Sequence, residues 1–152
     1  MLNIYYKLID DEEIINYIFH LPNNEKWLYD DTWQALSTTL PYLPHNYYLA
    51  CYLNDEIVGL VLGYPSESNK ELHLHLAFIP KVYGKCEEIC QGVIKWYLNN
   101  TPFDILVCSV ASNNSLARKI VKACNFSFYK HEKEGWLKNG IEYGKDFFIF
   151  AR

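Results

Sequence analysis

The sequence predicts one α/β domain of the α+β kind, in which helices flank a single mixed sheet. Its 152 residues match the usual length of one domain, and half of them are hydrophobic, which is enough to bury a core without disulfides or metals. Apolar residues recur with period two in some segments and with helical spacing in others, and the two kinds of segment alternate along the chain. No repeat, low-complexity tract or linker divides the sequence, so these elements belong to one fold.

The expected elements follow from these periods and from residues that start and stop them. The acidic run at residues 10–13 provides a helix N-cap, Pro41 ends a helix, and Asn54-Asp55 is a hairpin turn. Helices are expected at Asp10–His20, from Asp30 or Asp31 to Leu40, at Glu87–Leu98 and at Asn114–Cys124. Strands are expected at Asn3–Leu8, Tyr47–Leu53, Glu56–Tyr64, Glu71–Phe78 and Phe103–Ala111. The end of the chain predicts two strands around a glycine-containing loop, from the segments Phe126–His131, Trp136–Leu137 and Phe147–Ala151.

Charge and composition exclude several classes of protein. The net charge of −4 and the pI of about 5.7 argue against a basic nucleic-acid footprint. No apolar stretch approaches the ~20 residues that span a bilayer, and no secretory signal is visible, so a cytoplasmic protein is expected. Five cysteines lack the paired spacing of a zinc site, which predicts five reduced thiols, at Cys51, Cys86, Cys90, Cys108 and Cys124.

The segment 71–78 carries the most promising chemistry. Its strict alternation places Glu71, His73 and His75 on one face of a strand. A neutral imidazole, with a pKa near 6.5, suits a general base. Three ligands in a row do not converge on a tetrahedral metal, so no metal site is expected. The alternative is a polar face of the sheet that only meets solvent.

The order of elements resembles that of the GNAT superfamily of acyl-CoA-dependent N-acyltransferases. Two short motifs accompany this order: Phe78-Ile79-Pro80 enters a helix, and Asn114-Ser115-Leu116-Ala117 leads to Asn125-Phe126. The likeness covers nearly the whole chain, and the arrangement of elements is its specific part, since each short motif alone is weak. It implies a mostly antiparallel sheet of six or seven strands, splayed between the fourth and fifth strands, with about four helices. It also implies acetyl-CoA or another acyl-CoA as cofactor, with its pyrophosphate on the helix after the fourth strand, and an amine acceptor deprotonated by His73 or His75.

The phosphate loop departs from the family pattern Q/R-x-x-G-x-G/A. Counted from Pro80, the defining positions fall on Tyr83, Cys86 and Glu88, and none matches. A register that begins at Lys81 recovers Gly84 and places Cys86 where a small residue belongs. Glu87 and Glu88 favour a self-capped helix over an anion site. The cofactor-binding candidates are Phe78, Lys81, Tyr83, Gly84, Lys85, Cys86 and Asn114.

The sequence also leaves open which residue donates the proton and what the aromatic acceptor wall binds. The family's usual Tyr, seven residues after the Asn, is Val121 here, which leaves Ser115, Tyr129 and Tyr143 as substitutes. Aromatic residues crowd the segment that forms the acceptor wall in the resembling fold, where they predict an amine pocket, a protein-docking surface or ordinary core. They are Trp27, Tyr29, Trp33, Tyr42, Tyr47 and Tyr48.

Two functions from different classes remain. One is N-acyl transfer to an amine of a small molecule, a protein N-terminus or a lysine. The other is a GNAT-derived binding or assembly module with a protein partner, such as a head-assembly or virion-associated protein of a bacteriophage. A homodimer is compatible with both.

Overall fold

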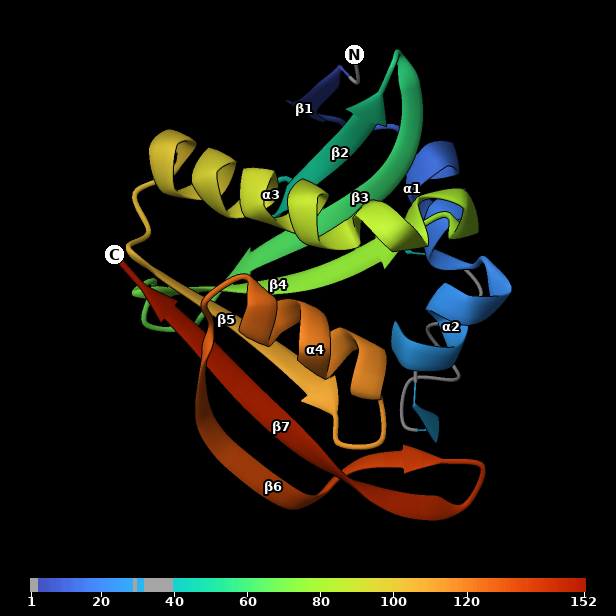
Figure 1. Cartoon of the computed structure of the whole chain (residues 1–152), viewed down its shortest axis with the longest axis vertical. Coiled ribbons are helices and arrows are strands. Elements are labelled where there is room, and N and C mark those ends of the chain that lie inside the picture. The colour runs from blue at the N-terminus through green and yellow to red at the C-terminus, as the bar shows by residue number, and fades with distance from the viewer. Residues whose placement is uncertain (1–2, 29, 32–39) are drawn as a thin grey trace.

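A seven-stranded sheet forms the centre of the molecule (Figure 1), and the computed structural model describes residues 3–28, 30–31 and 40–152. The strand order is β1-β2-β3-β4-β5-β7-β6, and only the central β4–β5 pair is parallel. The strands are β1 (Ile4–Leu8), β2 (Tyr47–Leu53), β3 (Glu56–Pro65), β4 (Glu71–Phe78), β5 (Ile105–Ala111), β6 (Ser127–Lys138) and β7 (Ile141–Ala151). This mixed, mostly antiparallel sheet confirms the predicted fold class.

Helices cover both faces of the sheet. One face is buried by α3 (Cys86–Asn100) and α4 (Ser115–Ala123), which lie side by side in front of the sheet in Figure 1. On the other face α1 (Glu12–Phe19) packs Ile15, Ile18 and Phe19 against β2 and β3. A 3₁₀ helix, η2 (Pro80–Lys85), joins β4 to α3. The sheet is therefore the middle layer of three, and β4 and β5 lie at its centre.

Local sequence signals set the helix starts. The Asp11 carboxylate accepts hydrogen bonds from the backbone of Glu13 at 3.0 Å and Ile14 at 3.3 Å, which caps α1 as expected. The Asn114 side chain accepts from the Ala117 backbone at 3.2 Å and caps α4 in the same way. Each cap sets the residue at which the helix begins after the preceding loop.

One helix was not predicted. The segment Pro22–Leu28 forms α2, because proline at the first turn lacks only an N–H that the helix does not use there. The helix expected from Asp30 or Asp31 falls mainly on residues 32–39, outside the described residues. Asp31 itself accepts hydrogen bonds from the backbone of Asn139 at 3.0 Å and Gly140 at 2.9 Å, at the turn between β6 and β7.

The C-terminal hairpin is longer than predicted. Where the sequence suggested short strands around a loop, β6 and β7 run as continuous strands to a tight turn. Asn139 and Gly140 occupy this turn with φ values of 53° and 77°, the left-handed conformation of a two-residue hairpin turn. The register of β6 shifts at Phe128/Lys130 and Glu132/Trp136, so the period-two pattern of this strand is interrupted and could not be recognised in the sequence. The hairpin extends away from the rest of the sheet (Figure 1).

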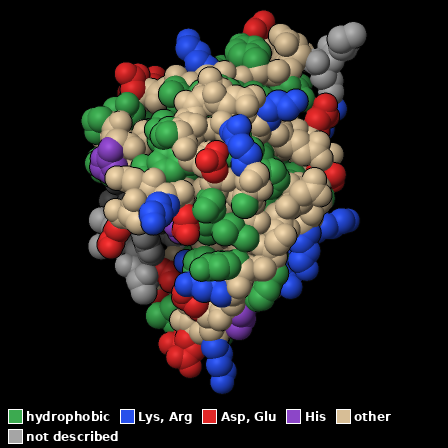
Figure 2. Space-filling view, turned by 90° about the vertical axis from the view of Figure 1, so that its left-hand side faces the viewer, with side chains coloured by type: hydrophobic (Ala, Val, Ile, Leu, Met, Phe, Trp, Pro, Cys, Tyr) green, Lys and Arg blue, Asp and Glu red, His purple; other side chains and the backbone are tan. Residues whose placement is uncertain are grey.

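The surface carries mixed charge. On the face shown in Figure 2, basic and acidic side chains are interspersed among apolar ones.

Across the described residues, none of the helices combines the length and the apolar character that crossing a membrane requires.

The packing of α3 on β1 yields a first prediction. A methyl group at Gly92 would overlap the Tyr6 hydroxyl, which donates to the Ile89 carbonyl at 2.8 Å. We expect Gly92→Ala to lower the free energy of unfolding by about 1–2 kcal/mol, because overpacking outweighs the gain in helix propensity. Urea unfolding measures the change. Gln91→Ala, at an exposed position of the same helix, is the matched control and should be neutral or stabilising. A more stable Gly92→Ala protein would contradict this packing.

Candidate active site

The two central strands separate along half of their length. Parallel pairing between β4 and β5 runs from Glu71 and Ile105 to Leu74 and Cys108, and stops there. Beyond that point, in the part of the chain that the structure describes, β4 continues to Phe78 paired only with β3, and β5 continues to Ala111 paired only with β7. The splay predicted between the fourth and fifth strands is thus present, and it leaves backbone groups on the inner edges of both strands without a partner strand.

A cavity of about 390 Å³ fills this gap. Its volume lies in the range of sites for small ligands, ~300–1000 Å³. The splayed halves of β4 and β5, the first turn of α4 and the start of α3 line it, together with Asn23, Asn24 and Trp27 of α2. Asn24 is buried and donates to the carbonyls of Ile18 at 2.8 Å and Phe78 at 3.1 Å, which fixes α2 to the end of β4.

His75 is the titratable imidazole of the cavity wall. Its ring stacks on Tyr64 of β3, with centroids 5.2 Å apart, and His73 stacks on the same tyrosine at the same distance. His75 Nε2 lies 3.2 Å from the Tyr64 hydroxyl, and His73 Nε2 lies 3.7 Å from a Glu71 carboxylate oxygen. The three candidate residues therefore form one cluster, of which His75 reaches the cavity.

Burial keeps these imidazoles neutral. Burial lowers the pKa of His75 to about 4, and the charge of Lys145 on β7 acts in the same direction. Burial also lowers the pKa of His73, although Glu71 opposes that shift. Burial raises the pKa of Tyr64, so its phenol stays protonated near neutral pH. His75 is consequently an unprotonated base at neutral pH.

The cofactor candidates divide into two groups. Phe78, Tyr83, Cys86 and Asn114 line the cavity, and the Tyr83 hydroxyl accepts a hydrogen bond from Asn23 at 2.9 Å. The other three lie in η2 and do not line the cavity. Lys81 Nζ is 2.5 Å from a Glu56 carboxylate oxygen, and Gly84 and Lys85 are the last two residues before α3.

The start of α3 has room for an anion. Among the described residues, no side chain caps its first turn, and no atom lies within 4 Å of the place where a Gly84 Cβ would be. Glu87 and Glu88 are in this turn, as expected, but both are exposed and neither caps it. The backbone N–H groups of the turn therefore lack side-chain acceptors.

The possible proton donors are not equivalent. Val121, where many relatives of the resembling fold have Tyr, is buried in the cavity wall, and Ser115 lies at its mouth on α4. Tyr129 is 56% exposed on β6, and neither it nor Tyr143 is part of the lining.

The cysteines are free and buried, as predicted. Cys86, Cys90 and Cys108 line the cavity. Burial raises the pKa of Cys86 to about 11 and that of Cys108 to about 12, so these thiols stay protonated and act as small apolar groups. Within the described residues no group of three or more potential ligands is placed to hold a metal ion.

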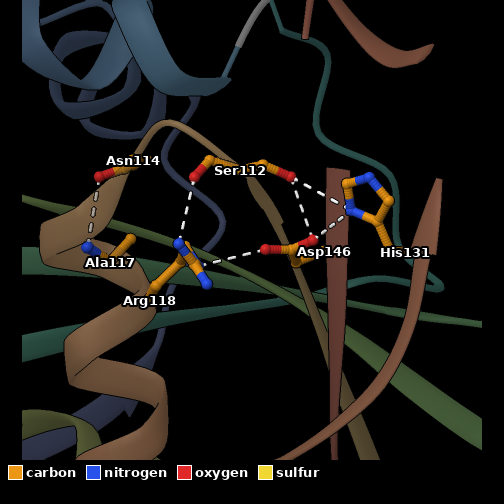
Figure 3. Close-up of polar contacts among 6 residues, drawn as sticks. All are labelled: Ser112, Asn114, Ala117, Arg118, His131 and Asp146. Atoms are coloured by element: carbon orange, nitrogen blue, oxygen red, sulfur yellow. Dashed lines mark hydrogen bonds and ion pairs between the residues drawn. The ribbon is translucent and has the colours of Figure 1, made fainter. Parts of the chain in front are cut away.

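A buried carboxylate, not anticipated from the sequence, holds the loop between β5 and α4 (Figure 3). Asp146 Oδ1 lies 2.6 Å from His131 Nδ1 and accepts from the Ser112 hydroxyl at 3.0 Å, and Arg118 Nε lies 3.1 Å from Oδ2. Burial alone raises the pKa of Asp146, but the hydrogen bonds from His131 and Ser112 and the charge of Arg118 lower it below the ordinary value. No local motif joins these four residues.

This network is next to the cavity. Ser112 directly precedes Asn113 and Asn114, which line it, and the Ser112 N–H donates to the Gly144 carbonyl at 2.8 Å. Arg118 extends from α4 and His131 from β6, so the Asp146 carboxylate ties the hairpin and α4 to the end of β5. Its role in the site is to position the loop.

Comparison with solved structures identifies the fold. Spermidine N-acetyltransferase from Vibrio cholerae, in complex with CoA and spermine, matches with a TM-score of 0.79 at 14% identity, over 97% of this chain and 95% of that chain. A probable acetyltransferase from Staphylococcus epidermidis matches over 99% of both chains, with a TM-score of 0.70 and 17% identity. The protein has the fold of the GNAT acetyltransferases.

Partial matches and sequence searches set limits to this likeness. RimL, an α-N-protein acetyltransferase in complex with coenzyme A, matches over 70% of this chain with a TM-score of 0.64 and 12% identity, and the chain spans 62% of the length of that protein. No family model and no curated protein matches the sequence.

The lowered pKa of His75 makes stability depend on pH. Between pH 6.5 and pH 4 the unfolded chain protonates this histidine and the folded chain does not, so stability falls as pH falls through this window. We expect His75 to contribute up to about 3 kcal/mol of this loss. Urea unfolding at several pH values measures it. His75→Gln should weaken the dependence, whereas His45→Gln, at an exposed histidine, should not change it. Equal slopes for wild type and His75→Gln would contradict the burial of this ring.

The Asp146 network gives a separate prediction. Asp146→Asn should lower the free energy of unfolding by about 1–3 kcal/mol, because Arg118 and His131 lose their anionic partner. Thermal and urea unfolding test this. The control is Asp104→Asn, which removes an ion pair of 3.2 Å from a side chain that is 73% exposed, and should change stability by no more than about 0.5 kcal/mol. Equal effects of both variants would mean that Asp146 is not a structural anchor.

Proposed function

We propose that this protein transfers an acyl group from acyl-CoA to a primary amine. The observation that carries the proposal is the cavity between the separated ends of β4 and β5, with the unprotonated His75 imidazole in its wall. The splay supplies space and unpaired backbone groups for an extended ligand, and the imidazole supplies a base beside it. The fold shared with acetyltransferases solved in complex with CoA supports the same function.

The residues present fit coenzyme A. The uncapped first turn of α3, with open space at Gly84 and the Lys85 cation beside it, suits a pyrophosphate. Inner-edge backbone groups of residues 75–78 suit the amides of a pantetheine arm, and the apolar lining from Phe78, Cys86 and Val121 suits its alkyl segments. When bound, acyl-CoA would supply the thioester that the amine attacks.

The chain's own contribution to the chemistry is proton transfer. An attacking amine must be neutral, and His75 is the base nearest to the splay. If Nε2–H donates to the Tyr64 hydroxyl, Nδ1 carries the lone pair and accepts the proton; in the described residues Nδ1 has no hydrogen-bond partner. Tyr64 stacks on the ring and orients it. The Ser115 hydroxyl, at the mouth of the cavity, is the candidate to protonate the leaving thiolate.

The assembly-module alternative gains no support. The neighbours named above are acetyltransferases, and the described residues present a cavity rather than a closed cleft.

Filling the cavity tests the cofactor site. Isothermal titration should detect binding of acetyl-CoA to the wild type, and Ala117→Trp, which places an indole in the cavity wall, should weaken that binding at least tenfold. Lys119→Trp, on an exposed position of the same helix, is the matched control and should bind normally. Absence of binding by the wild type overturns the proposal.

Release of free thiol from acetyl-CoA, measured with a panel of primary amines, tests the base. His75→Gln should lower kcat by roughly 10²- to 10⁴-fold and leave the Kd for acetyl-CoA within about twofold. In the wild type the acidic limb of kcat against pH should lie near pH 4 to 5 rather than near 6.5. Unchanged turnover in His75→Gln would exclude His75 as the base.

A further inference from the structure

Lys145 is a half-buried cation on the face of the sheet that carries His73 and His75. It lies opposite Ala111 in the β5–β7 register, and cross-strand neighbours share a face. His73 pairs with Val107 of β5, so His75 lies on this same face. The Lys145 ammonium is 5.9 Å from the ring centroids of Trp136 and Phe147. Its charge also acts on both His73 and His75.

No carboxylate neutralises Lys145 within the described residues. Its cross-strand neighbour Glu132 is paired with Lys130 at 3.4 Å, and Glu71 lies beside His73. The positions outside the described part, residues 1–2, 29 and 32–39, include no Asp or Glu. Of the groups that act on His75, Lys145 carries a positive charge, whereas burial keeps His73 neutral. Lys145 therefore adds positive potential on the face of the sheet that carries His75.

A second polar group on this face lacks a partner. Trp136 of β6 is 6% exposed, and its indole N–H, fully shielded from solvent, donates to no acceptor in the described part of the chain. Trp136 pairs with Tyr143, two residues before Lys145 on β7, so both side chains share one face. A buried donor without an acceptor is costly, by about 1–3 kcal/mol.

We propose that Lys145 and Trp136 bind an anionic group of the acceptor, so that the substrate is an amine that also carries a carboxylate or a phosphate. This inference rests on the proposed acyl transfer and names its acceptor class. The ammonium supplies charge and the indole supplies one directed hydrogen bond, and both suit an oxyanion. A polycation such as spermidine meets the charge of Lys145 and is disfavoured.

Matched pairs of amines test the assignment. The carboxylate arm compares 4-aminobutanoate with 4-aminobutanamide, the phosphate arm compares phosphoethanolamine with ethanolamine, and spermidine serves as the polycation. With wild type and acetyl-CoA, kcat/KM should be at least tenfold higher for an anionic amine than for its neutral partner, and lowest for spermidine. The arm with the larger ratio identifies the anion.

Two conservative variants connect that preference to the named residues. Lys145→Met and Trp136→Phe should each reduce the anionic preference, taken as the ratio of kcat/KM for the anionic amine to that for its neutral partner, to within about threefold, and should leave the Kd for acetyl-CoA within about twofold. Lys95→Met, an exposed lysine of α3, is the control and should keep the preference. Unfolding curves confirm that each variant is folded.

The outcomes separate the two proposals. Equal or better use of neutral amines or spermidine, an unchanged preference in Lys145→Met, or acetyl-CoA binding without turnover of any of these amines overturns the anionic-acceptor assignment. Failure of the wild type to bind acetyl-CoA overturns acyl transfer itself.

Discussion

The site depends on one constraint in the sheet: the parallel pairing of β4 and β5 ends at Leu74 and Cys108 while both strands continue. Each strand keeps an antiparallel neighbour on its outer side, so the split leaves two stable half-sheets rather than a frayed edge. The helices α3 and α4 begin at the carboxyl ends of the two strands, so both N-termini come to the mouth of the gap. The end of this pairing thus leaves the space and the inner-edge backbone groups, and the two helix N-termini lie beside them.

The two faces of the split sheet differ in chemistry. The side of α3 and α4 is apolar apart from helix termini and asparagines, and its buried thiols remain protonated. The opposite side carries the stack of Tyr64 with His73 and His75, and beyond it the unneutralised Lys145. His75 is where the two sides meet, because it lies on the second face and also lines the cavity. In the reaction proposed above, this division separates cofactor binding from acceptor recognition.

The fold was largely predictable, whereas the site was predictable only where it is local in sequence. Strict alternation in β4 placed His73 and His75 on one face, and the Asn114 cap marked the start of α4. The helix α2 was not predicted, because Pro22 and the two asparagines after it are typical of a loop. Asp146 contacts a loop residue, a helix residue and a residue of the neighbouring strand, namely Ser112, Arg118 and His131, and no spacing rule predicts such long-range contacts. The contact of Lys145 with Trp136 crosses from β7 to β6, where the register shifts of β6 conceal it in the sequence.

The contact of Asp31 with the hairpin turn has a consequence for the order of folding. Asp31 lies 108 residues before Asn139 and 109 residues before Gly140, and it binds the backbone N–H groups of both. The sheet itself also requires distant segments, because β1 and β6 form its opposite edges. Such long sequence separations raise the relative contact order, which slows folding of mixed α/β domains. This contact therefore forms only after both parts of the chain have docked, so a nascent chain cannot make it before its final strands are synthesised.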